Sequence, residues 1–343
     1  MRTRPAPSWT PTGDPLPRTT SLDDVVRVVA RRRVVVLSGA GLSTESGIPD
    51  YRGATGSLRR HTPMTYQEFV GSVEGRRRYW ARSHLGWRTI ARAAPNDGHR
   101  AVAVLRAAGH LSGVITQNVD GLHQAAGTPD VVELHGSLDR VICLDCGRTG
   151  DREELDHRLR AANPAFGGTA DRINPDGDVE LADEDVRDFQ LVDCRDCGSG
   201  ILKPDVVFFG ESVPRPRVQR CYQLVDEADA LLVLGSSLAV MSGLRFVRHA
   251  AKAGKPVLLV NRGQTRGDSC ATVRVALPLG EALTDLAARL GHPVPDHGQR
   301  SDRTGSPPWP VSSHCRPRRA TPSGTASTAA GTDASTGPSA PSP

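Results

Sequence analysis

The sequence predicts an α/β protein: a doubly wound, parallel, Rossmann-like sheet with a smaller inserted zinc-binding module. Short apolar runs of the kind that form buried strands alternate with helical stretches, a pattern typical of a parallel sheet covered on both faces. The first run leads directly into Gly39-Ala40-Gly41, and two Cys-x-x-Cys pairs interrupt the series. A phosphate loop and a metal module in one chain restrict the fold more than either feature alone.

The body begins with a helix and continues with the strands. Ser21-Leu22-Asp23-Asp24 has capping-box spacing and opens a Val-rich helix that is expected to end in Arg31-Arg32-Arg33. Ligands bind at the carboxyl ends of parallel strands, so polar side chains that follow each strand are candidate site residues. The strands are expected at Val34–Leu37, Val114–Thr116, Val131-Val132, Leu231–Leu234, Val257–Val260 and Val273–Ala276.

Composition excludes several function classes. The chain has 343 residues and a net charge of +5, but each predicted tail carries +2, which leaves the body nearly neutral. Aromatic residues make up only 4%, so a sequence-specific nucleic-acid platform is not expected. No apolar run approaches the roughly 20 residues that span a bilayer. The Arg-rich, Lys-poor composition indicates a GC-rich bacterial genome, and we expect a cytoplasmic monomer.

Both ends of the chain are expected to be disordered. Residues 1–20 and 292–343 are rich in Pro, Ser, Thr, Gly and Ala and lack apolar periodicity. An organelle transit peptide is the alternative for the leader, but its prolines prevent an amphipathic helix. The catalytic body is therefore predicted at residues 21–291.

The loop after the first strand is a candidate phosphate site. The small residues Gly39, Ala40, Gly41 and Ser43 allow backbone N–H groups to approach a pyrophosphate, although a tight strand-to-helix turn explains the glycines equally well. The loop is not GxGxxG, which disfavours an ordinary dehydrogenase. Residues 50–52 follow, where Asp50 and Arg52 form either part of the site or a solvated ion pair.

The second and third clusters follow the next strands. Gln117, Asn118 and Asp120 are suited to a carboxamide and ribose hydroxyls, whereas a capped helix start is the structural alternative. His135 is a reasonable general base because imidazole titrates near neutral pH, although a single histidine is more often structural.

Cysteine spacing predicts a metal module at about residues 137–202. Cys143, Cys146, Cys194 and Cys197 can close one tetrahedral zinc site, and four thiolates leave no open position, so the zinc is expected to be structural. A redox pair is the alternative. Three further cysteines are left as free thiols. The insert between the pairs contains residues 175–180, which are expected to reach back towards the site.

The last clusters complete the predicted pocket. Residues 203–211 form an extended segment that can add a peptide strand, or a plain core strand. Gly235, Ser236 and Ser237 follow one strand, and Asn261 and Arg262 follow the next, where they suit ribose and phosphate contacts.

These motifs resemble the sirtuin family of NAD-dependent protein deacylases, collinearly over about residues 22–290. The segments that carry the resemblance are 39–52, 116–123, 134–136, both cysteine pairs, 207–211 and 235–238. The similarity is greatest to the class II, mitochondrial-type branch, through segments 78–82, 139–147, 175–178 and 203–210. Tyr51 stands where the family usually has phenylalanine.

The resemblance implies a reaction and a set of roles. The acyl-lysine oxygen attacks ribose C1′ of NAD and releases nicotinamide, His135 acts as base with Asn118 in the catalytic set, and the products are free lysine and O-acyl-ADP-ribose. The implied NAD-binding residues are Gly39, Ala40, Gly41, Ser43, Asp50, Tyr51, Arg52, Gln117, Asn118, Asp120, Gly235, Ser236, Ser237, Asn261, Arg262 and Cys270. The implied substrate-binding residues are Tyr79, Arg82, Val207, Phe208, Gly210, Glu211 and Val240.

Two questions stay open in the sequence. Tyr79-x-x-Arg82 has the spacing that resembles the acidic-acyl branch of the family, which leads to the hypothesis of glutaryl-like or long acyl chains; packing and a surface charge are the alternative. Protein mono-ADP-ribosyl transfer and a non-catalytic NAD-sensing module are the rival functions.

Overall fold

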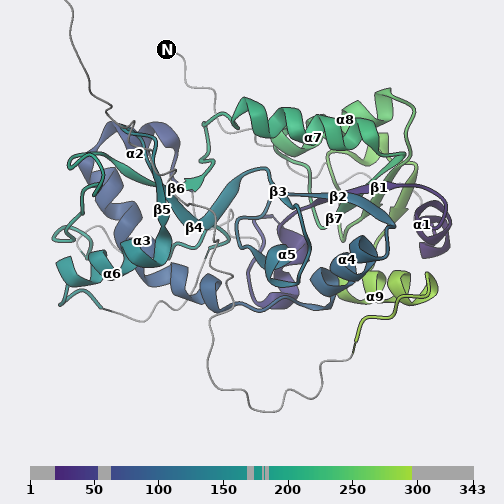
Figure 1. Ribbon diagram of the computed structural model, residues 1–343, viewed down its shortest axis with the longest axis horizontal. Helices are drawn as coiled ribbons and strands as arrows, with labels where there is room; N and C mark the ends of the chain where they lie inside the picture. Colours follow the sequence, from purple (N-terminus) through teal and green to yellow (C-terminus); the bar gives the residue numbers. More distant parts are fainter. Residues whose placement is uncertain (1–19, 53–62, 168–173, 180, 182–184, 296–343) are drawn as a thin grey trace, which may run out of the picture. The chain divides into compact units, whose positions relative to one another are not determined.

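The central element is a parallel sheet of six strands, which confirms the predicted fold class. The computed structural model describes residues 20–52, 63–167, 174–179, 181 and 185–295, all in one unit. The strand order is β3-β2-β1-β7-β8-β9, and every neighbouring pair is parallel (Figure 1). The strands are β1 (Val34–Ser38), β2 (Leu111–Thr116), β3 (Val132–Glu133), β7 (Ala230–Leu234), β8 (Val257–Val260) and β9 (Val273–Val275).

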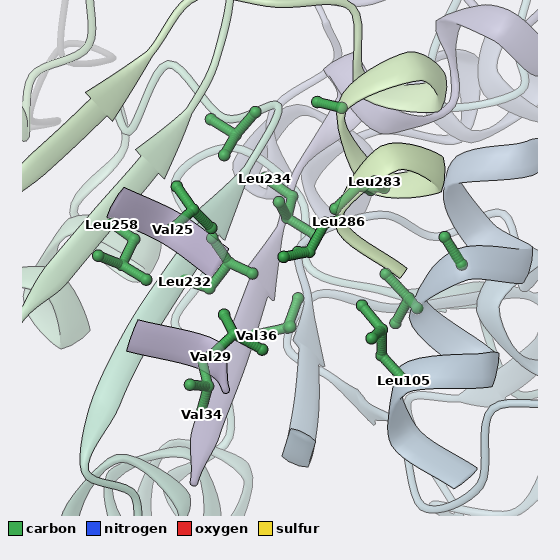
Figure 2. Packing of buried hydrophobic residues seen from close by; sticks show 14 of the residues in the cluster. Val25, Val29, Val34, Val36, Leu105, Leu232, Leu234, Leu258, Leu283 and Leu286 are labelled. Atoms are coloured by element: carbon green, nitrogen blue, oxygen red, sulfur yellow. The ribbon is translucent and has the colours of Figure 1, made fainter. Parts of the chain in front are cut away.

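Helices cover both faces of this sheet. In β1, Val34 and Val36 pack into one core cluster and Val35 and Leu37 into another, which explains why the strand is apolar throughout. Figure 2 shows the first cluster, where side chains from α1, α4 and α9 surround the strand residues. The helices on that face are α1 (Leu22–Val29), α4 (Asp97–Ala107) and α9 (Leu279–Arg289); those on the other are α7 (Arg215–Glu227) and α8 (Met241–Lys252).

The ends of the body differ from the predicted limits. The capping box at Ser21 is present, but α1 ends at Val29, before the three arginines. Thr20, assigned to the leader, exchanges hydrogen bonds with the backbone of Arg274. Val294, assigned to the tail, packs against the first core cluster. The rest of both predicted tails, residues 1–19 and 296–343, lies outside the described residues.

A second, smaller sheet forms the module that carries the cysteines. Its strands are antiparallel in the order β5-β4-β6, and its core also includes side chains from α2 and α3. These two helices precede the predicted module by more than 40 residues, so two separate chain segments build it. The elements are α2 (Tyr66–Gly71), α3 (Val73–Arg92), β4 (Gly136–Cys143), β5 (Thr149–Asp151), α6 (Arg152–Ala162) and β6 (Leu202–Val206).

Short elements complete the described chain. Among the described helices, none is both long and apolar enough to cross a membrane. The remaining elements are η1 (Ala40–Leu42), η2 (Thr44–Ser46), α5 (Leu122–Ala125) and η4 (Asp268–Cys270).

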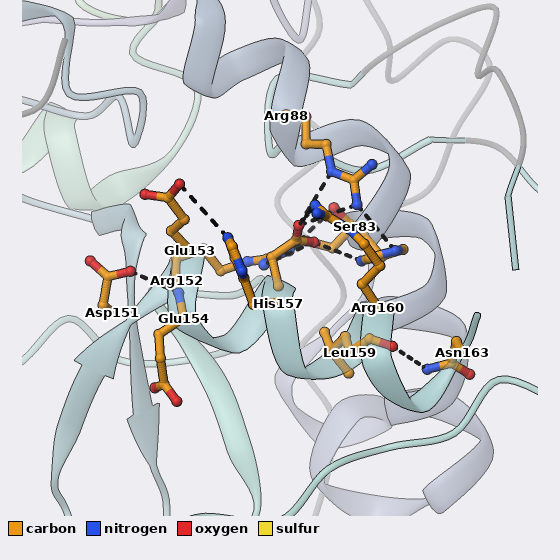
Figure 3. A network of polar contacts seen from close by, with 12 residues as sticks. Ser83, Arg88, Asp151, Arg152, Glu153, Glu154, His157, Leu159, Arg160 and Asn163 are labelled. Atoms are coloured by element: carbon orange, nitrogen blue, oxygen red, sulfur yellow. Dashed lines mark hydrogen bonds and ion pairs between the residues drawn. The ribbon is translucent and has the colours of Figure 1, made fainter. Parts of the chain in front are cut away.

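A buried charge network joins α3 to α6 (Figure 3). The Arg152 side chain is 0% exposed, and its guanidinium lies over the Trp80 and Trp87 rings at 5.2 and 4.6 Å from their centroids. Asp156 lies 3.7 Å from this guanidinium and accepts a hydrogen bond from Arg88. Burial raises the pKa of Asp156, but contact with His84 and the arginine charges outweigh it and lower the pKa to about 2. Asp156 therefore compensates the charge of Arg152, which water cannot reach.

We expect Asp156→Asn to lower the free energy of unfolding by about 3–5 kcal/mol, because it leaves a buried guanidinium without its carboxylate. Urea denaturation measures the change. Glu153→Gln on the same helix is the control, since the Glu153 side chain is 70% exposed and should change stability little. Equal stability of the two variants would contradict this account of the network.

Candidate functional site

A cavity of about 820 Å³ lies at the carboxyl ends of the strands in the central sheet. The loops that follow β1, β2, β7 and β8 all line it, as expected for a doubly wound fold. The predicted nucleotide-binding residues that line it are Gly39, Ala40, Gly41, Ser43, Asp50, Tyr51, Arg52, Gln117, Asn118, Asp120, Gly235, Ser236, Ser237, Asn261 and Arg262. The structure thus brings together clusters that lie more than 200 residues apart in the chain.

The glycines of the first loop permit a close contact between two loops. The Gly41 amide donates to the Gly235 carbonyl at 2.8 Å. A Cβ atom at Gly39 would lie 2.7 Å from the Ser236 Cβ, and one at Gly41 would lie 2.8 Å from the Gly235 oxygen. Both distances are too short for a side chain, so only glycine allows the loops after β1 and β7 to meet.

Amide side chains connect the same loops. Gln117 Nε2 donates to Ser236 Oγ at 2.8 Å, and Asn118 Nδ2 donates to Ser43 Oγ at 2.9 Å. Ser43 in turn donates to the Asp120 carboxylate at 2.6 Å. Asp120 also accepts from the Leu122 amide at 3.0 Å, but the N-cap of α5 is Gly121, so neither Asn118 nor Asp120 caps this helix as the structural alternative expected. These bonds hold three loops in one arrangement.

His135 lines the cavity as a neutral imidazole with a defined tautomer. Its Nδ1 lies 2.9 Å from the Gln117 carbonyl, which can only accept, so Nδ1 carries the proton. Nε2 is then unprotonated and accepts from the Ser242 hydroxyl at 2.8 Å. Burial lowers the pKa of His135 to about 4, which the Gln117 hydrogen bond opposes. Nε2 is therefore unprotonated at neutral pH and is available as an acceptor.

The segment after β6 also borders the cavity. Val207, Phe208, Gly210, Glu211 and Val240 all line the cavity. The strand ends at Val206, so the plain-strand interpretation holds only for its first part.

A buried ion pair holds the bend at the end of this segment. Lys203 is 3% exposed and lies 3.0 Å from the Glu211 carboxylate, which also accepts from the Phe208 amide at 2.8 Å. The Lys203 ammonium therefore fixes the backbone that faces the cavity.

Two predicted ligands do not line the cavity. The Arg82 guanidinium donates to the Leu181 carbonyl at 2.8 Å, although Tyr79, one helical turn earlier, does line the cavity. Cys270 ends η4 and packs against the core on the α7 and α8 face. The geometry therefore does not support a direct ligand role for either residue.

The cavity includes residues that the sequence did not single out as site residues. Ser242, which contacts His135, is one of them, and no local pattern marks it because the two positions are 107 residues apart. Pro175, Asp176 and Asp178 also line the cavity, so the insert reaches the site as expected.

The four predicted metal ligands form one cluster. Their sulfur atoms all lie within 4.8 Å of one another; Cys143 and Cys197 are 3.7 Å apart, and Cys146 and Cys194 are 3.8 Å apart. A tetrahedral zinc ion with Zn–S bonds of about 2.3 Å requires sulfur separations of about 3.8 Å. The cluster therefore fits one structural zinc ion.

Comparisons with known proteins agree with this geometry. The family model for the Sir2 family matches residues 39–242. An NAD-dependent protein deacetylase of Streptomyces coelicolor is 65% identical over 86% of this chain and 99% of its own length, and one of Mycobacterium avium is 52% identical over 80% and 97%. A solved Sir2 structure with a p53 peptide and NAD⁺ is 28% identical, covers 79% of this chain and 99% of its own, and has a TM-score of 0.62.

We expect Cys143→Ser to release the bound zinc and to destabilise the module, since one of four ligands is lost. The zinc content of the purified protein, measured by mass spectrometry of the metal, should fall from one ion per chain towards zero. Cys270→Ser, outside the cluster, is the control and should retain its zinc. Retention of zinc by Cys143→Ser would show that this thiolate is not a ligand.

The buried histidines predict a pH dependence of stability. Burial lowers the pKa of His123 to about 3. The folded state keeps this ring neutral, whereas the unfolded chain binds a proton near pH 6.5. Burial of neutral His123 therefore costs no stability above that pH, and the free energy of unfolding decreases as the pH falls below it. Between the unfolded and folded pKa values, each buried neutral histidine lowers the free energy of unfolding by about 1.4 kcal/mol for each unit by which the pH falls.

His123→Gln should therefore flatten the fall in stability between pH 6.5 and 5 by about 1.4 kcal/mol per pH unit. The difference from the unsubstituted protein is the quantity to measure by urea denaturation, because the raised pKa values of Asp176 and Glu133 act in the opposite direction in both proteins. Parallel pH profiles would contradict the neutral, buried state of His123.

Proposed function

The chain belongs to the Sir2 family, and we propose that it is an NAD-dependent protein lysine deacylase that releases nicotinamide, O-acyl-ADP-ribose and free lysine. One observation carries the proposal. His135, with an unprotonated Nε2, borders the same cavity as the four strand-end loops and the segment at residues 207–211. A base, a nucleotide site and a peptide-binding edge are the three parts that this reaction requires.

The donor set of the cavity suits NAD. The small residues of the 39–43 loop allow backbone N–H groups to contact phosphates. The side chains of Gln117, Asn118 and Asp120 suit a carboxamide and ribose hydroxyls, and those of Ser236, Ser237, Asn261 and Arg262 line the cavity farther along the sheet. When bound, NAD supplies the ribose carbon that accepts the acyl oxygen.

The residues of the chain then have distinct tasks in the proposed reaction. His135 Nε2 takes the proton from a ribose hydroxyl, while the Gln117 carbonyl keeps the other ring nitrogen protonated. Asn118 and Asp120 are already oriented by Ser43, so the amide and the carboxylate need little reorganisation. Val207, Gly210 and Glu211 offer backbone and side-chain partners to the peptide, and Phe208 and Val240 offer apolar contact.

The finer assignments belong to the same proposal. We place the chain in the class II, mitochondrial-type branch because its segments 78–82 and 203–210 resemble that branch. The cytoplasmic location is likewise inferred from the sequence. The monomeric state and the two tails rest on the sequence alone, and the body is taken to include Thr20 and Val294, which contact it.

We expect His135→Ala to reduce the formation of free lysine from an acetyl-lysine peptide by roughly 10²- to 10⁴-fold, the usual contribution of a general base. Mass spectrometry of the peptide and of O-acetyl-ADP-ribose measures the reaction. His249→Ala is the matched control, because His249 is a partly exposed histidine paired with Asp226 away from the cavity.

Two outcomes would contradict the proposal. Undiminished deacylation by His135→Ala would remove the residue from the mechanism. Transfer of ADP-ribose to the protein substrate with no loss of its acyl group would replace deacylation by ADP-ribosyl transfer.

A further inference from the structure

Two arginines line the cavity but have no part in the proposed reaction. Arg215 begins α7, and Arg245 lies in the second turn of α8. Arg215 is exposed and Arg245 is partly exposed, so solvent reaches both side chains. They therefore lie at the mouth of the cavity, where it opens to the surface, and a ligand that enters the cavity can contact them.

The two helices that carry these arginines point their N-terminal ends at the cavity. The helices lie side by side (Figure 1), and Tyr222 of α7 packs against Phe246 of α8 at 4.9 Å between ring centroids. In these two helices, all of whose residues the structure describes, those beyond Tyr222 and Arg245 do not line the cavity. The positive ends of two helix dipoles therefore add to the charge of the arginines.

Neither arginine forms an ion pair within the part of the chain that the structure describes. Arg215 makes no hydrogen bond there either, and Arg245 donates only to the Met241 carbonyl of its own helix, at 3.2 Å. Glu211, which precedes α7 in the chain, is already paired with Lys203 at 3.0 Å. The mouth of the cavity therefore keeps two uncompensated positive charges.

Both arginines follow the residues that are proposed to bind the peptide. The cavity lining is continuous over residues 206–213, which lead into α7, and over residues 235–242, which contain Val240, the N-cap residue of α8. Each of these stretches thus reaches the N-terminus of a helix that carries one arginine. A peptide that is bound along them therefore has its flanking residues beside Arg215 and Arg245.

We propose that Arg215 and Arg245 form a subsite for the substrate residues that flank the acyl-lysine, and that this subsite selects protein substrates with Asp or Glu beside the modified lysine. A guanidinium pairs with a carboxylate both by charge and by two parallel N–H donors, whereas a glutamine offers no charge and a lysine is repelled. The subsite rests on the proposed deacylase function and narrows its substrate class to acidic sequences.

Acetyl-lysine peptides of equal length test the proposal. In three versions, the two residues on each side of the acetyl-lysine are Glu, Gln or Lys, and the rest of the peptide is unchanged. We expect kcat/KM to be about three- to tenfold higher for the Glu peptide than for the Gln peptide, and lowest for the Lys peptide. The difference should lie in KM, because a contact remote from the reacting atoms is made equally in the ground state and the transition state. Raising the salt from about 0.05 M to about 0.5 M should bring the Glu-to-Gln ratio towards one, since ions screen exposed charges.

Variants of the two helices identify the residues responsible. Arg215→Gln and Arg245→Gln should each lower the Glu-to-Gln ratio of kcat/KM, and the double variant should bring it to about one. Arg215→Lys, which keeps the charge, should retain most of the ratio. Arg248→Gln is the matched control, because Arg248 is an exposed arginine of α8 that does not line the cavity. It should leave the ratio unchanged.

The outcomes separate this proposal from the one on which it rests. Equal kcat/KM for the Glu and Gln peptides, or a preference for the Lys peptide, would overturn the subsite and leave the deacylase intact. Turnover of none of the three peptides would overturn both. A ratio that falls as much in Arg248→Gln as in the double variant would show a general attraction to the surface and would overturn the assignment to Arg215 and Arg245.

Discussion

The contact between the loops after β1 and β7 is the constraint on which the site depends. The Gly41 amide bonds to the Gly235 carbonyl, and any side chain at Gly39 or Gly41 would collide with the facing loop. Because the loops meet as bare backbone, the side chains of Gln117 and Asn118 can bridge to Ser236 and Ser43. The glycines thus serve the packing of the site, which does not exclude the phosphate-binding explanation that the sequence also left open.

A second constraint comes from the smaller module. Its zinc cluster and its buried Arg152–Asp156 pair lie in the module that presents Tyr79 and residues 175–178 to the cavity. Metal binding and charge pairing therefore stabilise one wall of the site without taking part in the chemistry. This division agrees with four thiolate ligands, which leave the metal no open position for a substrate.

Local periodicity predicted the parts of the fold in which it is strong. The apolar runs of β1, β7 and β8 are buried on both faces, and the polar residues that follow them meet at one edge because parallel strands require it. His135, which also follows a predicted strand, lines the cavity, and the four cysteines, predicted from their spacing, form one cluster. Two Cys-x-x-Cys pairs are a specific sign of a structural zinc site because few other sites use four cysteines in this spacing.

Contacts between distant segments could not be predicted in this way. Nothing local links Ser242 to His135, or joins α2 and α3 to a sheet that begins at Gly136. The Tyr79-x-x-Arg82 spacing correctly put both residues on one helix. Side chains three residues apart on a helix do not point in the same direction, however, and the Arg82 guanidinium binds the Leu181 carbonyl. Side-chain direction at the edge of a pocket depends on such tertiary partners.

The most direct test of the account is nicotinamide release from NAD by the intact protein, measured with an acetyl-lysine peptide and with the same peptide carrying unmodified lysine. One cavity that binds both NAD and an acyl-lysine predicts release only with the acylated peptide. Release at the same rate with either peptide, or with none, would show that NAD cleavage does not involve an acyl group and would contradict the central claim.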